Sequence, residues 1–404
     1  MITNTGLRDD LTRDVYCVGG LPIDALDMAT VIERIEKAAT SRTPFLISTP
    51  NLHFLVQSRI DPEFRDSVLD SDVCPADGIA IIWIARLLGL PVKARVSGSD
   101  VFEALSAPER LARQLKVFLF GGAEGVAAQA AAKLSAVPAG LSCAGILDPG
   151  FGSIDDMSHD QVIDKVNASN ADFLAVALGA KKGQPWLYRN HHRLTIPIRV
   201  HLGAAINFMA GTVKRAPVWI RAVGFEWLWR IKEEPQLWRR YGYDGWVLLR
   251  LLFSRLLPLA IANRWCRFWS QRHPRALQIE IVQNQDSATI GLCGDACEEH
   301  IERAIASFQQ TLAGDNKNIV IDLSRVRYID GRFFGALLML RKRLKERGSK
   351  LSFIGAGLSI QRIFRLNELS FLLGMEEVSY VHREYGLLPV RLTPALVPPA
   401  SQAP

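Results

Sequence analysis

Residues 116–125 read KVFLFGGAEG, and an alanine-rich stretch follows them. Five residues typical of a buried strand run into a glycine-rich turn, and the alanines after the turn favour a helix. A strand that turns directly into a helix is the repeating unit of an α/β fold.

The same alternation extends in both directions from this unit. Further strands are predicted at 15–19, 45–48, 73–74, 141–147, 173–178 and 198–202. Helices are predicted between them at 27–39, 62–69, 79–88 and 161–168. This alternation favours a mostly parallel, Rossmann-like sheet with helices on both faces, so we expect an α/β domain over residues 1–212.

A second α/β pattern begins near Ala276. Its strands are predicted at 277–282, 289–292, 319–323 and 351–354, and its helices at 296–312, 333–346 and 359–366. The chain is therefore expected to continue with a basic segment at 213–275, a small α/β domain at 276–388, and a proline-rich, disordered tail at 389–404.

Composition sets outer limits on the class of protein. With 404 residues, 49% of them hydrophobic, the chain is long enough for two or three domains with buried cores. Residues 1–14 are polar and lack the features of a secretory signal, so none is expected. The cysteines form no Cys-x-x-Cys pair, which argues against a zinc site and favours reduced, cytoplasmic thiols.

The basic segment is also rich in tryptophan. Residues 211–275 contain thirteen Lys and Arg but four Asp and Glu, an excess larger than the whole-chain charge of +7, and they hold seven of the nine tryptophans. Arginine beside tryptophan suits anionic headgroups, because the cation meets phosphate and the indole lies at the water–lipid boundary. A nucleic-acid-binding face and a tryptophan-rich core with solvated arginines are the alternatives.

The longest apolar run, Val247–Ala262, lies within this segment. Arg250, Arg255 and Pro258 interrupt it, and it falls short of the roughly 20 clean apolar residues that cross a bilayer. We therefore expect it to lie on an anionic membrane surface and not to span the membrane.

Polar and glycine-rich residues follow four predicted strands of the first domain. They are Thr49 and Asn51, Asp77 with Gly78, Gly121 with Gly122, and Gly179 through Gln184. Ligands of open α/β sheets lie at the carboxyl ends of the strands, so we expect these residues to line one site. Asp77 is the candidate general base, because apolar neighbours raise the pKa of a carboxyl group; a simple helix cap is the alternative.

Two further motifs bear on metals and cofactors. Asp70 and Asp72 have the spacing of a metal-binding pair, but they precede a strand, at the wrong end of the sheet for a ligand. Gly121 and Gly122 open a helix whose N–H groups can hold a diphosphate, yet the pattern is not Gly-x-Gly-x-x-Gly. The sequence therefore predicts neither a metal nor a nicotinamide or other cofactor.

Residues 15–241 resemble the WecG/TagA/CpsF glycosyltransferases (glycosyltransferase family 26). The motifs that carry the resemblance are Ser48-Thr49-Pro50-Asn51, Pro75-Ala76-Asp77-Gly78, Gly98-Ser99-Asp100, Phe120-Gly121-Gly122, Gly203-Ala204-Ala205, and above all Lys214-Arg215-Ala216-Pro217 with Gly224-Phe225-Glu226-Trp227 and Glu234-Pro235.

The resemblance implies inverting, metal-independent transfer of a sugar from a UDP-sugar to a lipid-diphosphate-linked acceptor, at the inner face of a bacterial membrane. It also implies a basic C-terminal appendage that docks on the membrane and closes the site. Asp77 would take the proton from the acceptor hydroxyl, with Thr49 beside it. The residues expected to bind substrate are Asn51, Ser99, Asp100, Gly121, Gly122, Gly179, Arg215, Arg230 and Arg240.

One stretch departs from the family pattern. The family usually shows Gly-Ser-Pro-Lys-Gln-Glu after its last-but-one strand, where this chain has Gly179-Ala180-Lys181-Lys182-Gly183-Gln184. Without a gap the family glutamine falls on Gly183, so Gln184 is the candidate to replace it in catalysis.

Residues 276–385 resemble a STAS domain, the fold of anti-sigma-factor antagonists, through Ile319–Gly335 and Leu351–Gly355. STAS switches often carry a phosphorylatable serine two residues after the aspartate that matches Asp330, and here that residue is Arg332. The resemblance thus implies a module that binds a protein partner or stabilises an assembly, without a phospho-switch at this position.

Together these features predict a membrane-associated UDP-sugar transferase of bacterial polysaccharide or glycolipid synthesis, on the cytoplasmic face of the plasma membrane. Its expected partners are a UDP-sugar, a lipid-diphosphate acceptor and an anionic membrane surface, but not nucleic acid. The competing interpretation is a scaffold or signalling protein that acts through its STAS domain. The altered Gly183–Gln184 stretch favours the scaffold, whereas Thr49, Asn51 and Asp77 argue against it.

Overall fold

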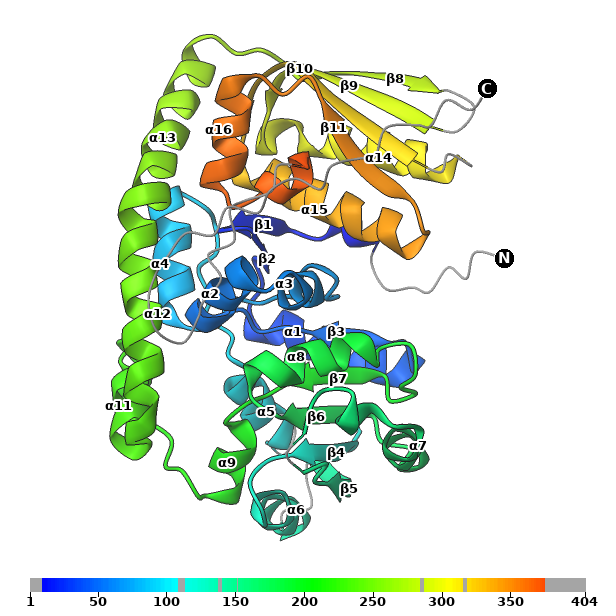
Figure 1. Ribbon diagram of the computed structural model, residues 1–404, viewed down its shortest axis with the longest axis vertical. Coiled ribbons are helices and arrows are strands. Elements are labelled where there is room, and N and C mark those ends of the chain that lie inside the picture. The colour runs from blue at the N-terminus through cyan, green and yellow to red at the C-terminus, as the bar shows by residue number, and fades with distance from the viewer. Residues whose placement is uncertain are drawn as a thin grey trace, which may run out of the picture.

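The computed structural model of the protein describes residues 9–107, 113–136, 140–150, 152–283, 287–314 and 318–374. Its first domain is built on a five-stranded parallel sheet in the order β3-β7-β6-β4-β5 (Figure 1). The strands are β3 (Phe45–Ile47), β4 (Leu115–Gly121), β5 (Leu141–Leu147), β6 (Phe173–Ala177) and β7 (Ile198–His201). The predicted parallel α/β sheet is confirmed.

Helices cover both faces of this sheet, which is also confirmed. One face packs through a continuous apolar cluster against α1 (Met28–Ser41), α5 (Gly98–Ser106), α6 (Val126–Ala136) and α9 (Ala205–Ala210). The other face packs against α7 (Asp160–Ala168) and α8 (Ala180–Arg189). On this second face the rings of Phe120 and Trp186 stack with their centroids 4.3 Å apart.

Two predicted strands fall outside the five-stranded sheet. β1 (Val15–Val18) forms an antiparallel hairpin with β2 (Leu21–Asp24), because Gly19 and Gly20 adopt positive φ and turn the chain back at once. Residues 73–74 contribute a single bridge to Ile47 and no strand. The hairpin forms a third apolar layer with α2 (Leu52–Ile60), α3 (Pro62–Leu69) and α4 (Ile79–Leu88).

The basic segment is helical and ends in one long helix. Two short helices, α10 (Val218–Ala222) and α11 (Glu226–Glu233), lead into α12 (Trp238–Leu251), the π-helical turn η4 (Leu252–Leu256) and α13 (Leu257–Arg272). Pro235–Arg272 is the one described helix that is long and apolar enough to cross a membrane. The helix extends well beyond the predicted apolar run Val247–Ala262, and that this run lies on a membrane surface without spanning it stays a prediction. Pro258 is tolerated because it falls in the first turn of α13, directly after the π turn.

The long helix lies along the protein. Val247, Leu251, Leu256 and Leu259 are buried in the third apolar layer with α2 and α4. Figure 1 shows the helix running beside both domains. Its outward side leaves large apolar residues exposed, namely Trp246, Leu249, Phe253, Ile261, Trp265, Phe268 and Trp269. The long helix thus has two apolar stripes. One packs against the protein and the other faces solvent.

The second domain has a four-stranded sheet in the order β11-β10-β9-β8. Its strands are β8 (Gln278–Gln283), β9 (Ser287–Ala296), β10 (Asn318–Ile329) and β11 (Lys350–Ile354), and its helices are α14 (Ile301–Ala313), α15 (Gly331–Glu346) and α16 (Leu358–Leu366). β8 and β9 are antiparallel, and the other neighbours are parallel. The predicted small α/β domain is confirmed, and the expected tail at 389–404 lies outside the described residues.

The two domains share part of one core. Leu11, Val15 and Leu69 of the first domain belong to the apolar cluster that contains the buried face of α15. The two backbones come close at Gly335, where an added Cβ would lie 2.0 Å from the carbonyl oxygen of Val15. Helix α15 therefore packs directly on the backbone of β1, which only glycine permits.

Gly335 and Gly242 provide a matched pair of glycine-to-alanine tests. Gly335→Ala is expected to lower stability by about 1–3 kcal/mol, because its Cβ meets the Val15 backbone. Gly242 lies inside α12 with open space around it, so Gly242→Ala is expected to keep or raise stability, by up to about 1 kcal/mol. Thermal unfolding followed by circular dichroism measures both, and an unchanged Tm for Gly335→Ala would contradict this packing.

Candidate active site

A cavity of about 730 Å³ opens where β3, β4, β6 and β7 end. The opposite wall comes from α11 and α12 of the basic segment, which supply Trp227, Arg240 and Leu248. Among the described residues, none beyond Leu248 lines it. The site is therefore built by the five-stranded sheet and the basic segment, and no described residue of the second domain contributes a side chain to it.

Asp77 lies in the cavity wall between β3 and α4. Its backbone N–H donates to Pro50 O at 2.9 Å, which fixes it beside the loop after β3. The N-cap of α4 is Gly78, with no side-chain cap, so the structure does not use Asp77 as a helix cap. Burial raises the pKa of Asp77 to about 7, and nearby Glu226 adds to this effect. A carboxyl group with this pKa can accept a proton near neutral pH.

Several predicted residues gather beside Asp77. The cavity-lining members of the predicted set are Thr49, Asn51, Asp77, Ser99, Gly122, Gly179, Arg230 and Arg240. Asn51 is the N-cap of α2, where it accepts a hydrogen bond from Phe54 N, and it also hydrogen-bonds to Asp77. Gly179 is the N-cap of α8 with φ of 74°, so the first turn of α8 brings backbone N–H groups to the cavity.

Gly121, Asp100 and Arg215 lie outside the cavity lining. At Gly121 a Cβ would lie 2.7 Å from Leu178, so this glycine permits close packing behind the wall. Asp100 forms ion pairs with Arg95, Arg215 and Arg221. In this structure Asp100 and Arg215 therefore hold the appendage on the catalytic domain.

Arg95 is a cavity residue that the sequence did not reveal. Its guanidinium donates to Glu226 Oε2 at 2.9 Å and to Asp100 Oδ2 at 3.0 Å. Since Glu226 begins α11, Arg95 joins the appendage to the catalytic domain next to Asp77. The sole sequence signal was its position just before the Gly98-Ser99-Asp100 motif.

Gln184 does not reach the cavity. Its side chain is fully buried and donates to Ser48 Oγ and, at 3.3 Å, to Ser67 O. The neighbouring Gly183 packs against His201, whose Cδ2 would lie 2.3 Å from an added Cβ. The structure therefore corrects the catalytic assignment: His201 fills the space that a side chain at position 183 would need, and Gln184 supports the loop from behind.

His201 is a second cavity residue that the sequence did not reveal. Its Nε2 is buried without a hydrogen-bond partner among the described residues. Burial lowers the pKa of His201 to about 4, and nearby His53 acts in the same direction. His201 is therefore neutral at physiological pH and offers one ring nitrogen to whatever occupies the cavity.

Two of the three predicted arginines face the cavity. Arg230 pairs with Glu234 at 2.8 Å, and the guanidinium of Arg240 lies 4.9 Å from the centre of the Tyr241 ring. The Nε atoms of both arginines are buried without a hydrogen-bond partner in the part of the chain that the structure describes. Both therefore have donor capacity left for an anion.

A second link between the appendage and the core crosses the cavity wall. His53 Nδ1 on α2 lies 3.0 Å from Asp244 Oδ2 on α12, and Asp244 is buried. Both residues line the cavity. The wall formed by α12 is thus fastened to the core by a buried polar contact as well as by apolar packing.

Asp70 and Asp72, which have the spacing of a metal-binding pair, form ion pairs with lysines. Asp70 pairs with Lys345 at 2.7 Å, and Asp72 pairs with Lys342 at 2.7 Å. Both lysines belong to α15. These carboxylates therefore join the two domains, and neither of them lines the cavity.

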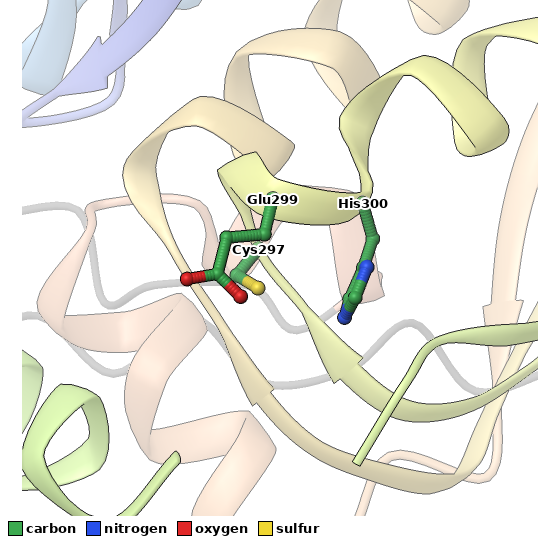
Figure 2. A group of neighbouring side chains, drawn as sticks. All are labelled: Cys297, Glu299 and His300. Carbon is green, nitrogen blue, oxygen red and sulfur yellow. The ribbon is translucent and has the colours of Figure 1, made fainter. Parts of the chain in front are cut away.

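Figure 2 shows Cys297, Glu299 and His300, whose potential ligand atoms lie within 4.8 Å of one another. They belong to the 3-10 turn η5 (Glu298–His300) and the residue before it, in the second domain. Burial raises the pKa of Cys297 to about 11, and the nearby Asp330 adds to the effect. Two of the three residues are partly exposed and Glu299 is fully at the surface, where acidic groups often gather without an ion, so we assign no metal to this group.

Comparison with known proteins places both domains in families. The model of the glycosyl transferase WecG/TagA/CpsF family matches residues 16–261, and the model described as Mlab, STAS domain, matches residues 279–374. This chain is 28% identical over 194 residues to the N-acetylglucosaminyldiphosphoundecaprenol N-acetyl-beta-D-mannosaminyltransferase of Bacillus spizizenii. The matched residues cover 48% of this chain and 73% of that protein. In the enzyme of the same name from Bacillus subtilis, 224 residues are 25% identical, over 55% of this chain and 85% of that protein.

Solved structures resemble the second domain. The anti-sigma factor antagonist SpoIIAA in its unphosphorylated form covers 24% of this chain and 85% of its own, at 17% identity and a TM-score of 0.22. A STAS domain from Rhodobacter sphaeroides covers 20% of this chain and 85% of its own, at 20% identity and a TM-score of 0.17.

The first family model spans more than half of the chain and includes every residue that lines the cavity. The chain therefore belongs to the WecG/TagA/CpsF family of glycosyltransferases and carries a STAS domain at 279–374.

Proposed function

We propose that the protein transfers a hexose or N-acetylhexosamine from a UDP-sugar to a sugar linked to polyprenyl diphosphate. The observation that carries this proposal is Asp77, whose pKa is raised to about 7 in a cavity at the carboxyl edge of the sheet. The names of the two Bacillus relatives support the acceptor class, since those enzymes act on N-acetylglucosaminyldiphosphoundecaprenol.

In the proposed reaction, the acceptor hydroxyl gives its proton to Asp77 while its oxygen bonds to the anomeric carbon of the donor. The bond from that carbon to the diphosphate oxygen breaks, and UDP leaves with the electron pair. Attack from the side opposite the leaving group inverts the anomeric centre. Thr49 and Asn51, on the loop beside Asp77, orient the reacting sugar.

The departing diphosphate is negatively charged, and the chain supplies cations for it. Arg230, Arg240 and Lys182 line the cavity, and α8 begins in its wall. Guanidinium groups and helix N-termini stabilise developing phosphate charge without a metal ion. We therefore propose a metal-independent reaction without a cofactor.

We further propose that the appendage docks on the cytoplasmic face of the plasma membrane. The exposed apolar residues of α4, α10, α11 and the long helix include Trp83, Val218, Trp219, Phe225, Trp238, Trp246, Phe253 and Trp265. Exposed apolar area on this scale marks an interaction surface, and arginines between the aromatic residues suit anionic headgroups. Because its other side is buried against the protein, the long helix lies in the plane of the interface.

Asp77→Asn is expected to lower turnover by about 10²–10⁴-fold while leaving the fold and UDP binding intact, because the base is lost and the shape is kept. The measurement is UDP release from a panel of UDP-sugars with a polyprenyl-diphosphate-linked acceptor. Asp164→Asn, at an exposed position on α7, is the matched control. Turnover of Asp77→Asn within about threefold of wild type would exclude Asp77 as the base. No UDP release from wild type with any donor would favour the scaffold interpretation.

Excess EDTA is expected to leave turnover unchanged, because the diphosphate is neutralised by Arg230, Arg240 and the start of α8. The same UDP-release assay measures this after dialysis against the chelator. Loss of activity that magnesium or manganese restores would show that a metal takes part after all.

Trp219→Ala combined with Trp246→Ala is expected to weaken binding to anionic vesicles by about tenfold or more, since two exposed indoles no longer enter the interface. These side chains are 69% and 53% exposed and do not line the cavity. Leu358→Ala, at an 85% exposed position of the STAS domain, is the control. Equal co-sedimentation of both variants with phosphatidylglycerol vesicles at low salt would contradict the proposed membrane surface.

A further inference from the structure

The face of the STAS domain that carries Asp330 and Arg332 packs against the first domain of the same chain. Arg332 is buried, and its guanidinium donates to Val15 O at 3.2 Å. Asp330 caps α15 through Phe333 N and also accepts from Glu298 N at 2.8 Å. Helix α15 lies against β1, as Figure 1 shows. This face therefore has a partner within the same chain.

We propose that the STAS domain is an internal clamp on the active site. One arm reaches from Lys342 to the loop that carries Thr49 and Asn51. The other arm consists of hydrogen bonds to α13, which fix the position of α12, and α12 forms the opposite wall of the cavity. The partner of this STAS surface is the chain's own catalytic domain and appendage. This goes beyond the proposed reaction, because it requires only the cavity and not a particular sugar.

The first arm starts at a buried lysine. Lys342 Nζ donates to Asp72 Oδ1 at 2.7 Å and to Asp10 Oδ1 at 3.2 Å. Arg13, also buried, pairs with the same Asp10 at 2.8 Å and with Asp24 at 2.7 Å. Two cations and three carboxylates thus meet between the domains. Removing one member would leave a buried charge without its partner, so the group resists separation of the domains.

This charged group continues into the active-site loop. The second carboxylate oxygen of Asp72 accepts from Leu46 N, in β3, at 2.7 Å. Lys342 also donates to Ser71 O at 3.3 Å, and Ser71 Oγ lies 2.7 Å from Ser48 Oγ. Ser48 directly precedes Thr49. Lys342 is therefore a positioning residue: it holds the end of β3 and the start of the loop that faces the substrate.

The second arm consists of STAS side chains that hold α13. Tyr328 Oη donates to Asn263 Oδ1 at 3.3 Å, and Ser270 Oγ donates to Asp295 Oδ2 at 2.7 Å. Both Asn263 and Asp295 are buried. The α13 helix is thus fixed to the STAS sheet by polar contacts at two positions, about two turns apart.

Helices α12 and α13 belong to one continuous helix, which connects the STAS contacts of α13 with the cavity wall. Asn263 lies roughly 28 Å along the helix axis from Asp244, which meets His53 in the cavity wall. The π-helical turn between them is the irregular part of this helix. It is braced by the STAS domain too, since Arg255 Nη1 donates to Arg365 O at 2.9 Å. Both walls of the active site therefore depend on STAS contacts.

Hydrogen exchange of the full-length protein, without substrate, tests the helix arm. The double variant Asn263→Ala/Ser270→Ala removes the two contacts from the helix side. Arg264→Ala/Gln271→Ala changes the adjacent exposed positions and is the control. Amides of 238–251 are expected to exchange about tenfold faster in the first variant than in the control, since two hydrogen bonds are lost, while β8–β10 stay protected. Equal exchange of 238–251 in both variants would overturn this arm.

Lys342→Met tests the loop arm in the same experiment. Amides of 46–54 are expected to exchange about tenfold faster than in wild type, with β8–β10 unchanged. Arg325→Met, at an exposed STAS position paired with Glu280, is the control and should leave 46–54 unchanged. If Lys342→Met fails to fold, Lys342→Gln replaces it, because a neutral polar side chain weakens the contact with Asp72 and leaves the bond between Asp72 and Leu46 N in place. Unchanged exchange of 46–54 in the folded variant would overturn the loop arm.

Discussion

Exclusion of water from the carboxyl group of Asp77 is the condition on which the proposed chemistry depends. Burial is the main cause of its pKa of about 7, and Arg95 beside it works in the opposite direction. A solvated aspartate titrates near pH 4 and is a much weaker base. The burial comes from segments far apart in the sequence, including α4 and helix α11 of the appendage, which begins at Glu226. The helices that cover the cavity therefore help to raise the pKa of Asp77, and the same helices carry the proposed membrane surface.

Polar contacts fix the position of the helices that cover the cavity. Arg95 binds Glu226, and His53 meets Asp244, so both α11 and α12 are fastened to the catalytic domain beside the cavity. Apolar packing of the long helix adds attraction without specifying position, whereas a buried pair costs free energy unless its partners meet. The STAS domain extends the same arrangement outward, since Lys342 and Asp295 act on the two walls from outside the site. The glycosyltransferase-family domain, its appendage and the STAS domain are therefore joined into one packed unit.

The fold could be predicted from sequence wherever an element carries its own local pattern. The five-stranded sheet and the STAS strands show runs of buried residues, whereas residues 73–74 before Asp77 form only an isolated bridge. The β1 strand was misplaced because a short apolar run does not reveal its partner. Arg95 and His201 were missed because their roles depend on residues that fold against them. Gln184 was assigned from its position in a motif, but its side chain is buried and donates to Ser48 and Ser67 instead of facing the cavity.

The pH dependence of turnover tests the state of Asp77 most directly. The carboxylate must be ionised to accept the hydroxyl proton, so turnover on a soluble acceptor is predicted to be low in acid and to rise through about pH 7, the pKa that burial gives this group. Asp77→Asn should lose this rise. A wild-type profile that is already level above about pH 5, as a solvated carboxyl group would give, would contradict the account.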